Sequence, residues 1–330
     1  MQAFLNRMLS LVVVLGGFLA HSAAGAPATV ELRKGTVLRF ATAKEARSIL
    51  GAKDEFIDRL SEFERSVMLK SVQPVSTGEF LTFVAAQAED WTESEMERMS
   101  PLIQSVGAKI HWMTVSLPEE VLLIKTSENV EGGNPHTRSN AVILPRAVSN
   151  VPDEVLEKII LHELFHVLSR YHPELRESLY SIVGFRMCKE IELPASLHSR
   201  RITNPDAPSI NVAIEVEFEN RQLLVAPILL SSVTSVAEAM NLPFPVGFLD
   251  FRLLEIQEVG DRCSPKLSQG EPILHMLTDV KGYIEKTGQN TQYIIHPEEI
   301  LADNFVLVAN AAKSIPSERI VKELQGVLAR

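Results

Sequence analysis

The segment from residue 151 to about residue 170 is apolar on almost every side, and this feature most constrains the fold. A helix with so few positions facing water has to be buried. Pro152 suits the first helical turn, and Asp153 and Glu154 place negative charge at the positive end of the helix dipole. We therefore expect this helix to be buried in the fold and not to lie on its surface.

His162 and His166 lie four positions apart on this helix, so both side chains share one face and can bind one ion. Imidazole nitrogen is a common zinc ligand, and a catalytic zinc site keeps one position for water. Glu163 faces the bound water instead of the ion and can accept its proton. The pattern predicts a zinc site with Glu163 as the general base. The alternative is a pair of core histidines hydrogen-bonded to backbone or carboxylate groups.

The site needs a third protein ligand, and the sequence offers two candidates. His172 follows His162 by ten residues, as in the metzincin pattern, but Ser169 stands where that pattern has a glycine. That glycine lets the chain turn back toward the metal. If the helix instead runs on to Arg170, it carries His172 past the metal. An exposed histidine just after the helix is the simpler interpretation.

The second candidate, Glu299, begins a helix expected at about 297–312. Pro297 suits the first turn, and Asp303 lies four residues after Glu299 on the same face. One carboxylate can bind the metal while the other accepts a hydrogen bond from a ligand imidazole and fixes its orientation. We favour Glu299 as the ligand and Asp303 as the orienting residue over a solvated acidic helix start.

Taken together, His162-Glu163-x-x-His166 and Glu299-x-x-x-Asp303 resemble the motifs of gluzincin zinc metallopeptidases, the thermolysin-like and neprilysin-like branch of the zincins. The segments around both motifs also look like uncharacterised exported bacterial HExxH proteins. The resemblance implies Zn²⁺ as the cofactor, with His162, His166 and Glu299 as its ligands. It also implies an α+β, zincin-like metallopeptidase domain. A long β-containing insertion must separate the two motif helices, because their spacing far exceeds that of thermolysin-like enzymes.

Peptide hydrolysis also needs a donor for the developing oxyanion and a place for the substrate. Tyr293, six residues before Glu299, is the first candidate donor, and His296 and Arg138 are weaker ones. A packed tyrosine or a surface cation is the alternative for each. The strand expected at 140–144, just before the histidine helix, is a candidate to pair with an extended peptide. The resemblance implies the same, because zincins place an edge strand there.

Apolar spacing and turn residues predict the remaining organisation. Residues 27–110 are expected to form a mostly helical N-terminal region, and residues 111–330 the zincin-like catalytic domain. Helices and strands that follow one another without regular alternation favour an α+β fold. The other expected helices lie at 53–69, 92–106, 174–182 and 316–329, and the expected strands at 121–125, 141–144, 248–259 and in a hairpin at 211–232 that turns at Glu219-Asn220.

Residues 1–26 have the order of a secretory signal peptide. Arg7 precedes an apolar run that is short for a membrane span, and small residues follow up to Ala26. We therefore expect export to the periplasm or the medium, and no membrane span in the mature chain. The sequence leaves open whether Cys188 and Cys263, its two cysteines, form a disulfide or remain buried thiols.

The formal net charge of −10 argues against nucleic acid as a partner, because an acidic surface repels phosphates. The sequence predicts an exported zinc metallopeptidase, a hydrolase that cleaves peptide or protein substrates with a zinc-bound water activated by Glu163. The alternative is a non-catalytic, zinc-stabilised binding protein of the cell envelope. A third hypothesis is another zinc hydrolase, or a peptidase kept latent by residues 27 to about 110.

Overall fold

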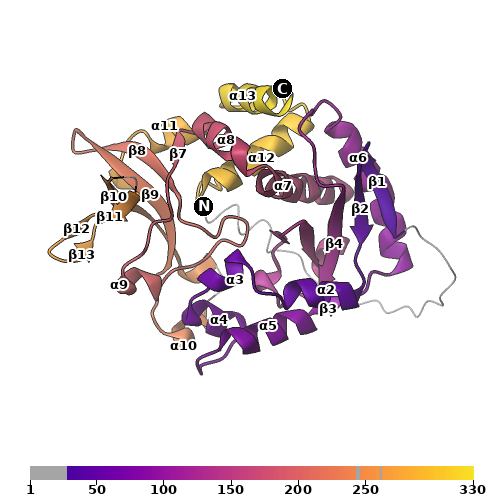
Figure 1. Cartoon of the computed structure of the whole chain (residues 1–330), viewed down its shortest axis with the longest axis horizontal. Coiled ribbons are helices and arrows are strands. Elements are labelled where there is room, and N and C mark those ends of the chain that lie inside the picture. The colour runs from indigo at the N-terminus through magenta and orange to yellow at the C-terminus, as the bar shows by residue number, and fades with distance from the viewer. Residues whose placement is uncertain (1–27, 243–245, 261) are drawn as a thin grey trace.

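The computed structural model describes residues 28–242, 246–260 and 262–330, so the expected signal peptide lies outside the described residues. Two sheets lie at opposite ends of the molecule, and helices α7 (Asp153–Tyr171) and α12 (Pro297–Ala309) lie between them (Figure 1). The mixture of helices and strands fits the expected α+β class. In the described part of the chain, no helix is both long and apolar enough to cross a membrane.

The first sheet has the strand order β1-β2-β4-β6-β5, and the short β3 pairs with the end of β4. β4 runs parallel to β2 and β6, whereas β1 and β5 are antiparallel strands at the two edges. Neighbouring side chains on a strand point to opposite faces, so Leu123 packs into one core while Leu122 and Ile124 pack into another. The strands are β1 (Thr29–Arg33), β2 (Thr36–Phe40), β3 (Ala88–Glu89), β4 (Glu120–Thr126), β5 (His136–Arg138) and β6 (Ala141–Pro145).

Helices cover both faces of this sheet. Residues of α6 and α7 share the core that holds Leu123, and residues of α2 and α5 belong to the core on the other face. The helix expected at 53–69 is divided, because Leu60 is extended and Ser61 starts a new helix. Ser61 Oγ accepts from the Glu64 amide at 3.1 Å, and the Glu64 carboxylate accepts from the Ser61 amide at 2.8 Å. The helices are α2 (Ala43–Leu50), α3 (Glu55–Arg59), α4 (Glu62–Met68), α5 (Thr77–Ala86) and α6 (Glu93–Lys109).

The expectation that the strand at 140–144 can pair with a substrate is wrong. β6 pairs with β4 on one side and with β5 on the other, so both of its sides are already hydrogen-bonded. The three-residue β5 is the edge strand instead. The sheet also crosses the expected boundary near residue 110, because β2 pairs with β4. The regions 27–110 and 111–330 therefore share one sheet.

The second sheet is antiparallel, with the order β11-β10-β9-β8-β7, and β14 also pairs with β10. Its centre contains the predicted hairpin, in which Glu219 and Asn220 have φ angles of 48° and 61°. Two successive positive φ angles are typical of the tight turns that join antiparallel strands. The strands are β7 (Phe185–Met187), β8 (Val212–Phe218), β9 (Arg221–Ser231), β10 (Leu249–Val259), β11 (Arg262–Pro265) and β14 (Leu274–His275), with a separate pair β12 (Leu267–Ser268) and β13 (Glu271–Pro272).

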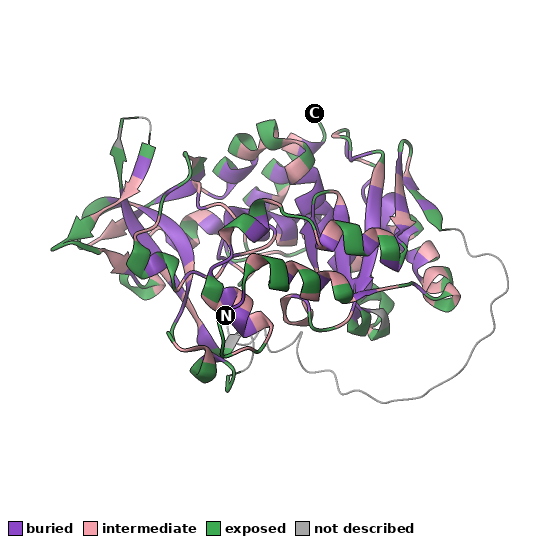
Figure 2. Ribbon diagram, turned by 60° about the horizontal axis from the view of Figure 1, so that its bottom comes forward, coloured by how far each residue is buried: buried purple, intermediate pink, exposed green. Residues whose placement is uncertain are grey.

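One hydrophobic core joins the two sheets. It contains Leu123 of the first sheet, Val225 of the second, Leu164 of α7 and Phe305 of α12. Figure 2 shows buried residues running through the sheets and the helices between them. The helix predicted from its all-round apolar character therefore lies at the centre of the molecule. The remaining helices are α8 (Arg176–Ile182), α9 (Ala195–His198), α10 (Val236–Ala239), α11 (Tyr283–Thr287) and α13 (Glu318–Leu328).

Candidate metal centre

Helices α7 and α12 pack against each other and carry the predicted metal ligands. Ala302 on α12 is fully buried, and its small side chain permits a close approach of the two helices. Nε2 of His162 lies 3.2 Å from Oε2 of Glu299, and Nε2 of His166 lies 3.6 Å from the same oxygen. One ligand atom from each of these three residues lies within 4.8 Å of the other two. The fold thus brings Glu299 to two histidines that lie far from it in the sequence.

The spacing of these atoms fits a bound cation. A tetrahedral zinc ion with ligands at about 2.0–2.2 Å places its ligand atoms about 3.3 Å apart. The observed separations of 3.2 and 3.6 Å are close to that value. Nε2 of His166 is also buried without a hydrogen-bond partner in the described part of the chain. Because buried polar atoms are normally paired, a metal ion at this position would satisfy it. His162, His166 and Glu299 could therefore hold a metal ion.

Two carboxylates orient the imidazoles. Oδ1 of Asp303 lies 3.0 Å from Nδ1 of His162, and Oε1 of Glu298 lies 3.1 Å from Nδ1 of His166. Each contact directs the Nε2 atom of its ring toward Glu299. Asp303 is held in turn by a hydrogen bond from the Thr291 hydroxyl. Both histidines thus present the same nitrogen to the candidate metal position.

Sequence reasoning missed Glu298, which is fully buried and accepts two further hydrogen bonds. Oγ of Ser169 donates to it at 2.8 Å, and the Tyr180 hydroxyl donates at 2.5 Å. Ser169 is the residue that replaces the glycine of the metzincin pattern, so that departure has a structural role here. In the sequence, Glu298 looks like one more acidic residue in the first turn of a helix. Its partners on α7 become apparent only when the two helices are packed together.

We call His162, His166 and Glu299 the ligand group. Burial and hydrogen bonding set the pKa values of its members. Burial alone would lower the pKa of His162, but the hydrogen bonds to Asp303 and Glu299 outweigh it and raise this pKa to about 10. Burial would raise the pKa of Glu299, but His166 and His162 hold it well below its usual range. A proton therefore lies between His162 and Glu299 when no ion is bound. A metal ion has to displace that proton, so metal affinity should increase with pH.

Glu163, the predicted general base, lies on α7 beside the two histidines and is 4% exposed. Its Oε2 atom is buried and has no hydrogen-bond partner among the described residues. Burial, together with the nearby charge of Asp206, raises the pKa of Glu163 to about 8. A cation at the ligand group would lower this pKa, because positive charge favours the carboxylate. Glu163 thus has an oxygen available to accept a proton next to the candidate metal.

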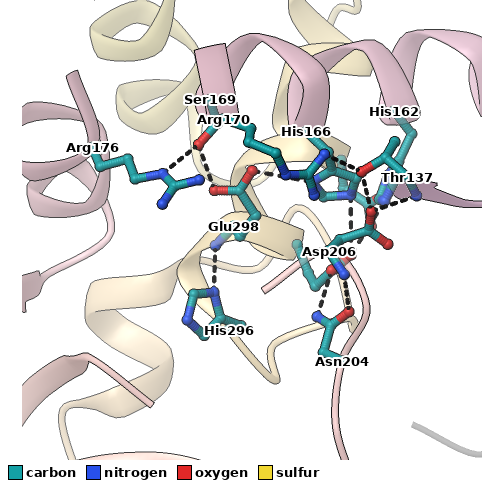
Figure 3. Close-up of polar contacts among 12 residues, drawn as sticks. Thr137, His162, His166, Ser169, Arg170, Arg176, Asn204, Asp206, His296 and Glu298 are labelled. Carbon is teal, nitrogen blue, oxygen red and sulfur yellow. Dashed lines mark hydrogen bonds and ion pairs between the residues drawn. The ribbon is translucent and has the colours of Figure 1, made fainter. Parts of the chain in front are cut away.

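A loop at 203–209 crosses the site, and sequence reasoning did not anticipate it (Figure 3). The side-chain amide of Asn204 donates from Nδ2 to Oε1 of Glu299 at 2.7 Å. A carboxylate oxygen of Asp206 belongs to a second close group with Glu163 and His166, also within 4.8 Å of one another. Oδ1 of Asp206 accepts hydrogen bonds from the amide and the hydroxyl of Thr137 on β5, at 2.8 and 2.5 Å. The loop therefore connects the sheet edge to the ligand group.

Both ends of this loop are attached to the N-terminal helices. The amide of Thr203 donates to Glu64 on α4, and the hydroxyl of Ser209 donates to Glu55 on α3. The local sequence around Asn204 is that of an ordinary turn, so no local pattern could have revealed its contact with the site.

Tyr293 lies next to the ligand group. Its ring stacks on that of His162, with 6.4 Å between the ring centroids and 21° between the planes. Burial, followed by the charge of Glu299, raises the pKa of the Tyr293 phenol well above its usual range. The phenol therefore keeps its proton and can act as a hydrogen-bond donor. This placement is compatible with the role predicted for it.

The structure places the other candidates differently. His296 caps α12, because its Nδ1 accepts from a main-chain amide of that helix at 3.1 Å. Arg138 is used structurally, since its Nε donates to Asp54 and its Nη2 to the carbonyl of Ala52 at 2.9 Å. His172 follows the last residue of α7 and bonds to a main-chain carbonyl at 2.9 Å, away from the ligand group.

Comparison with known proteins does not assign this site. No protein-family model, curated protein or solved structure matches the chain.

Proposed function

We propose that the protein is an exported zinc metallopeptidase with a zincin-like fold. On this proposal the chain between α7 and α12, including the second sheet, is an insertion between the two motif helices. The observation that carries it is the meeting of His162, His166 and Glu299 around one position, with Glu163 beside them. A zinc site built for structure alone has no need of a buried carboxylate with a vacant oxygen.

The surrounding residues have complementary roles in this proposal. Zinc, when bound, would polarise the substrate carbonyl and make a water more acidic. Oε2 of Glu163 accepts the proton from that water, since it has no other partner in the described structure. The phenol of Tyr293 donates to the oxyanion, and Asp303 and Glu298 keep the imidazoles in place.

One observation favours a second candidate function. The carboxylate of Asp206 lies beside Glu163 and His166, where it could complete a closed site with four protein ligands. Such a site would be typical of a non-catalytic, zinc-stabilised binding protein. A closed site predicts that Asp206→Asn weakens zinc binding, whereas a site open to water predicts almost unchanged zinc affinity in this variant.

The test combines metal content with peptide cleavage. The purified wild-type protein, Glu163→Gln and Glu299→Ala would be compared for zinc stoichiometry and for cleavage of a peptide library by mass spectrometry. We expect one zinc per wild-type chain, unchanged zinc but no cleavage in Glu163→Gln, and loss of both in Glu299→Ala. Glu154→Gln on the exposed start of α7 is the matched control and should behave as wild type.

Two results would contradict the proposal. Equal cleavage by wild type and Glu163→Gln would remove the assigned base. Stoichiometric zinc without cleavage of any library peptide, together with weaker zinc binding in Asp206→Asn, would favour the closed, non-catalytic site.

A further inference from the structure

A cavity of about 160 Å³ lies beside the candidate metal centre. Its wall includes Asp206, which also lies next to Glu163 and His166. Arg170, another lining residue, is four positions after His166 on α7 and so lies one turn further along a similar face of the helix. A cavity of this size has room for several waters or for one small polar group with its stem.

Two arginines of the cavity form no ion pair within the described chain, although the charge of Arg176 helps to lower the pKa of the nearby Glu298. Arg170 donates from Nη1 to Oγ1 of Thr137 at 2.8 Å and to the carbonyl of Ser139 at 2.9 Å. Arg176 on α8 donates only from Nε, to Oγ of Ser169 at 3.2 Å. No carboxylate of the described chain lies within ion-pair distance of either guanidinium, and the Nη groups of Arg176 have no acceptor there. Both cations thus retain donors for a ligand.

His296 gives independent support. It lines the same cavity and is 7% exposed. Its Nδ1 accepts from the Glu298 amide, so the neutral ring carries its proton on Nε2. That Nε2 atom is buried and has no hydrogen-bond partner among the residues described. An unpaired buried donor is uncommon in a folded protein, and a ligand with acceptor oxygens would satisfy it.

The acidic residues that line the cavity are already paired. Asp54 accepts from Arg138, and Asp206 accepts from the amide and hydroxyl of Thr137. Glu55 accepts from the Ser209 hydroxyl. Asp206 accepts through Oδ1 alone, so its Oδ2 is an acceptor without a partner among the described residues. The unpaired donors of Arg170, Arg176 and His296 outnumber it, which favours an anionic ligand over a cationic one.

We propose that this cavity is a carboxylate-binding subsite in which Arg170 and Arg176 bind a carboxylate of the peptide substrate close to the scissile bond. Guanidinium groups suit carboxylates because their planar donors match two oxygens. The carboxylate belongs either to the free C-terminus of the peptide or to an Asp or Glu side chain. This inference rests on the proposed peptidase function and specifies its substrate class.

The test measures binding without turnover, on the full chain of Glu163→Gln loaded with zinc. Calorimetry would compare N-acetylated tripeptides with a free C-terminus, the same peptides as C-terminal amides, and amides that carry an internal Glu or Gln. We expect loss of the recognised carboxylate to weaken binding about tenfold or more. A loss between free C-terminus and amide identifies the C-terminal carboxylate as the recognised group, and a loss between Glu and Gln identifies a side-chain carboxylate.

Arg176→Gln in the same background provides the second measurement, because only one hydrogen bond of the folded chain is lost. This variant should bind the carboxylate peptide more weakly, because only Arg170 then remains to bind the carboxylate, and should bind the uncharged analogue unchanged. Arg47→Gln on the exposed side of α2 is the matched control, and zinc content and melting temperature report an intact fold. Arg176→Lys should recover part of the affinity.

Equal affinity for charged and uncharged peptides, or no binding of either, would overturn the subsite. An equal loss of affinity for both peptides in Arg176→Gln would overturn it as well. Failure of the peptidase proposal gives a different result. If the protein cleaves no peptide but binds carboxylate peptides through Arg176, the subsite is correct and the peptidase function is not.

Discussion

Oε1 of Glu298 lies 3.1 Å from Nδ1 of His166, and this contact reproduces the one between Asp303 and His162 on the other ligand. Each imidazole is therefore held by its own carboxylate from α12. Because such contacts fix the tautomer and orientation of a ligand histidine, the candidate metal centre depends on four side chains of one helix pair in addition to Glu299.

Replacement of either carboxylate should weaken metal binding. We expect Glu298→Gln and Asp303→Asn each to raise the zinc dissociation constant by about 10- to 100-fold, measured by competition with a chelating indicator. Glu318→Gln on α13, an exposed acid paired with Lys322, should have no effect. Unchanged affinity in Glu298→Gln would show that the buried glutamate supports the fold and not the ligand.

His172 should be dispensable for the metal. Its Nε2 bonds to the carbonyl of Ser116 and its Nδ1 lies 2.8 Å from Glu174, so the side chain attaches the end of α7 to a neighbouring loop. We expect His172→Ala to retain full zinc content and to lose about 1 kcal/mol of unfolding free energy. Loss of zinc in this variant, seen by atomic absorption, would revive the metzincin-like ligand set.

Stability should decrease in acid through His136 on β5. Burial lowers the pKa of its imidazole to about 4, and the ring Nδ1 lies 3.1 Å from the carbonyl of Asn134. The unfolded chain protonates this histidine near pH 6.5, whereas the folded chain does so only near pH 4. The contribution of His136 to the unfolding free energy is therefore largest above pH 6.5 and decreases by about 2.5 kcal/mol between pH 7 and pH 4.5.

Urea unfolding of the metal-free protein at pH 7 and pH 4.5 measures this effect. In His136→Gln the decrease should be smaller by about 2.5 kcal/mol. The buried His296, whose pKa burial also lowers to about 4, is present in both proteins and contributes equally. The same pH dependence in wild type and variant would contradict the assignment.

Cys188 and Cys263 are free thiols next to each other in the structure. Burial and the neighbouring Cys263 raise the pKa of the Cys188 thiol to about 12. The thiolate fraction at neutral pH is therefore small, and Cys188 should react slowly with alkylating reagents until the chain unfolds. Timed alkylation followed by peptide mass spectrometry measures this rate, and fast labelling of the native chain would contradict it.

Oxidation should join the same pair. We expect a disulfide to form under a mild oxidant and to add about 3 kcal/mol to the unfolding free energy, because it closes a long loop. Cys188→Ser, treated with the same oxidant, should show no gain in urea stability.

Patterns within single segments predicted much of the fold. The apolar periodicity of α7 and α12 and the turn between β8 and β9 depend on neighbouring residues, and these elements lie where they were expected. The break at Leu60 was missed because the periodicity continues across it, although the capping pair Ser61 and Glu64 was visible. The pairing of β6 on both sides was missed because periodicity does not identify a strand's neighbours.

The residues of the candidate site were likewise predictable only where local spacing reveals them. His162, His166, Glu299 and Asp303 were found because four-residue spacing places side chains on one helix face. Asp206 was not found, because its position beside Glu163 arises only when the loop at 203–209 is folded across the site. Long-range placement of this kind leaves no periodic trace in the sequence.

The two helices that carry the ligands border the second sheet, one before it and one after it along the chain. A chain that emerges from its amino end has no complete coordination group until nearly all of it has been synthesised and α12 has docked on α7. If the proposed peptidase function holds, an incomplete chain therefore cannot cleave other proteins, because its metal ligands have not yet come together.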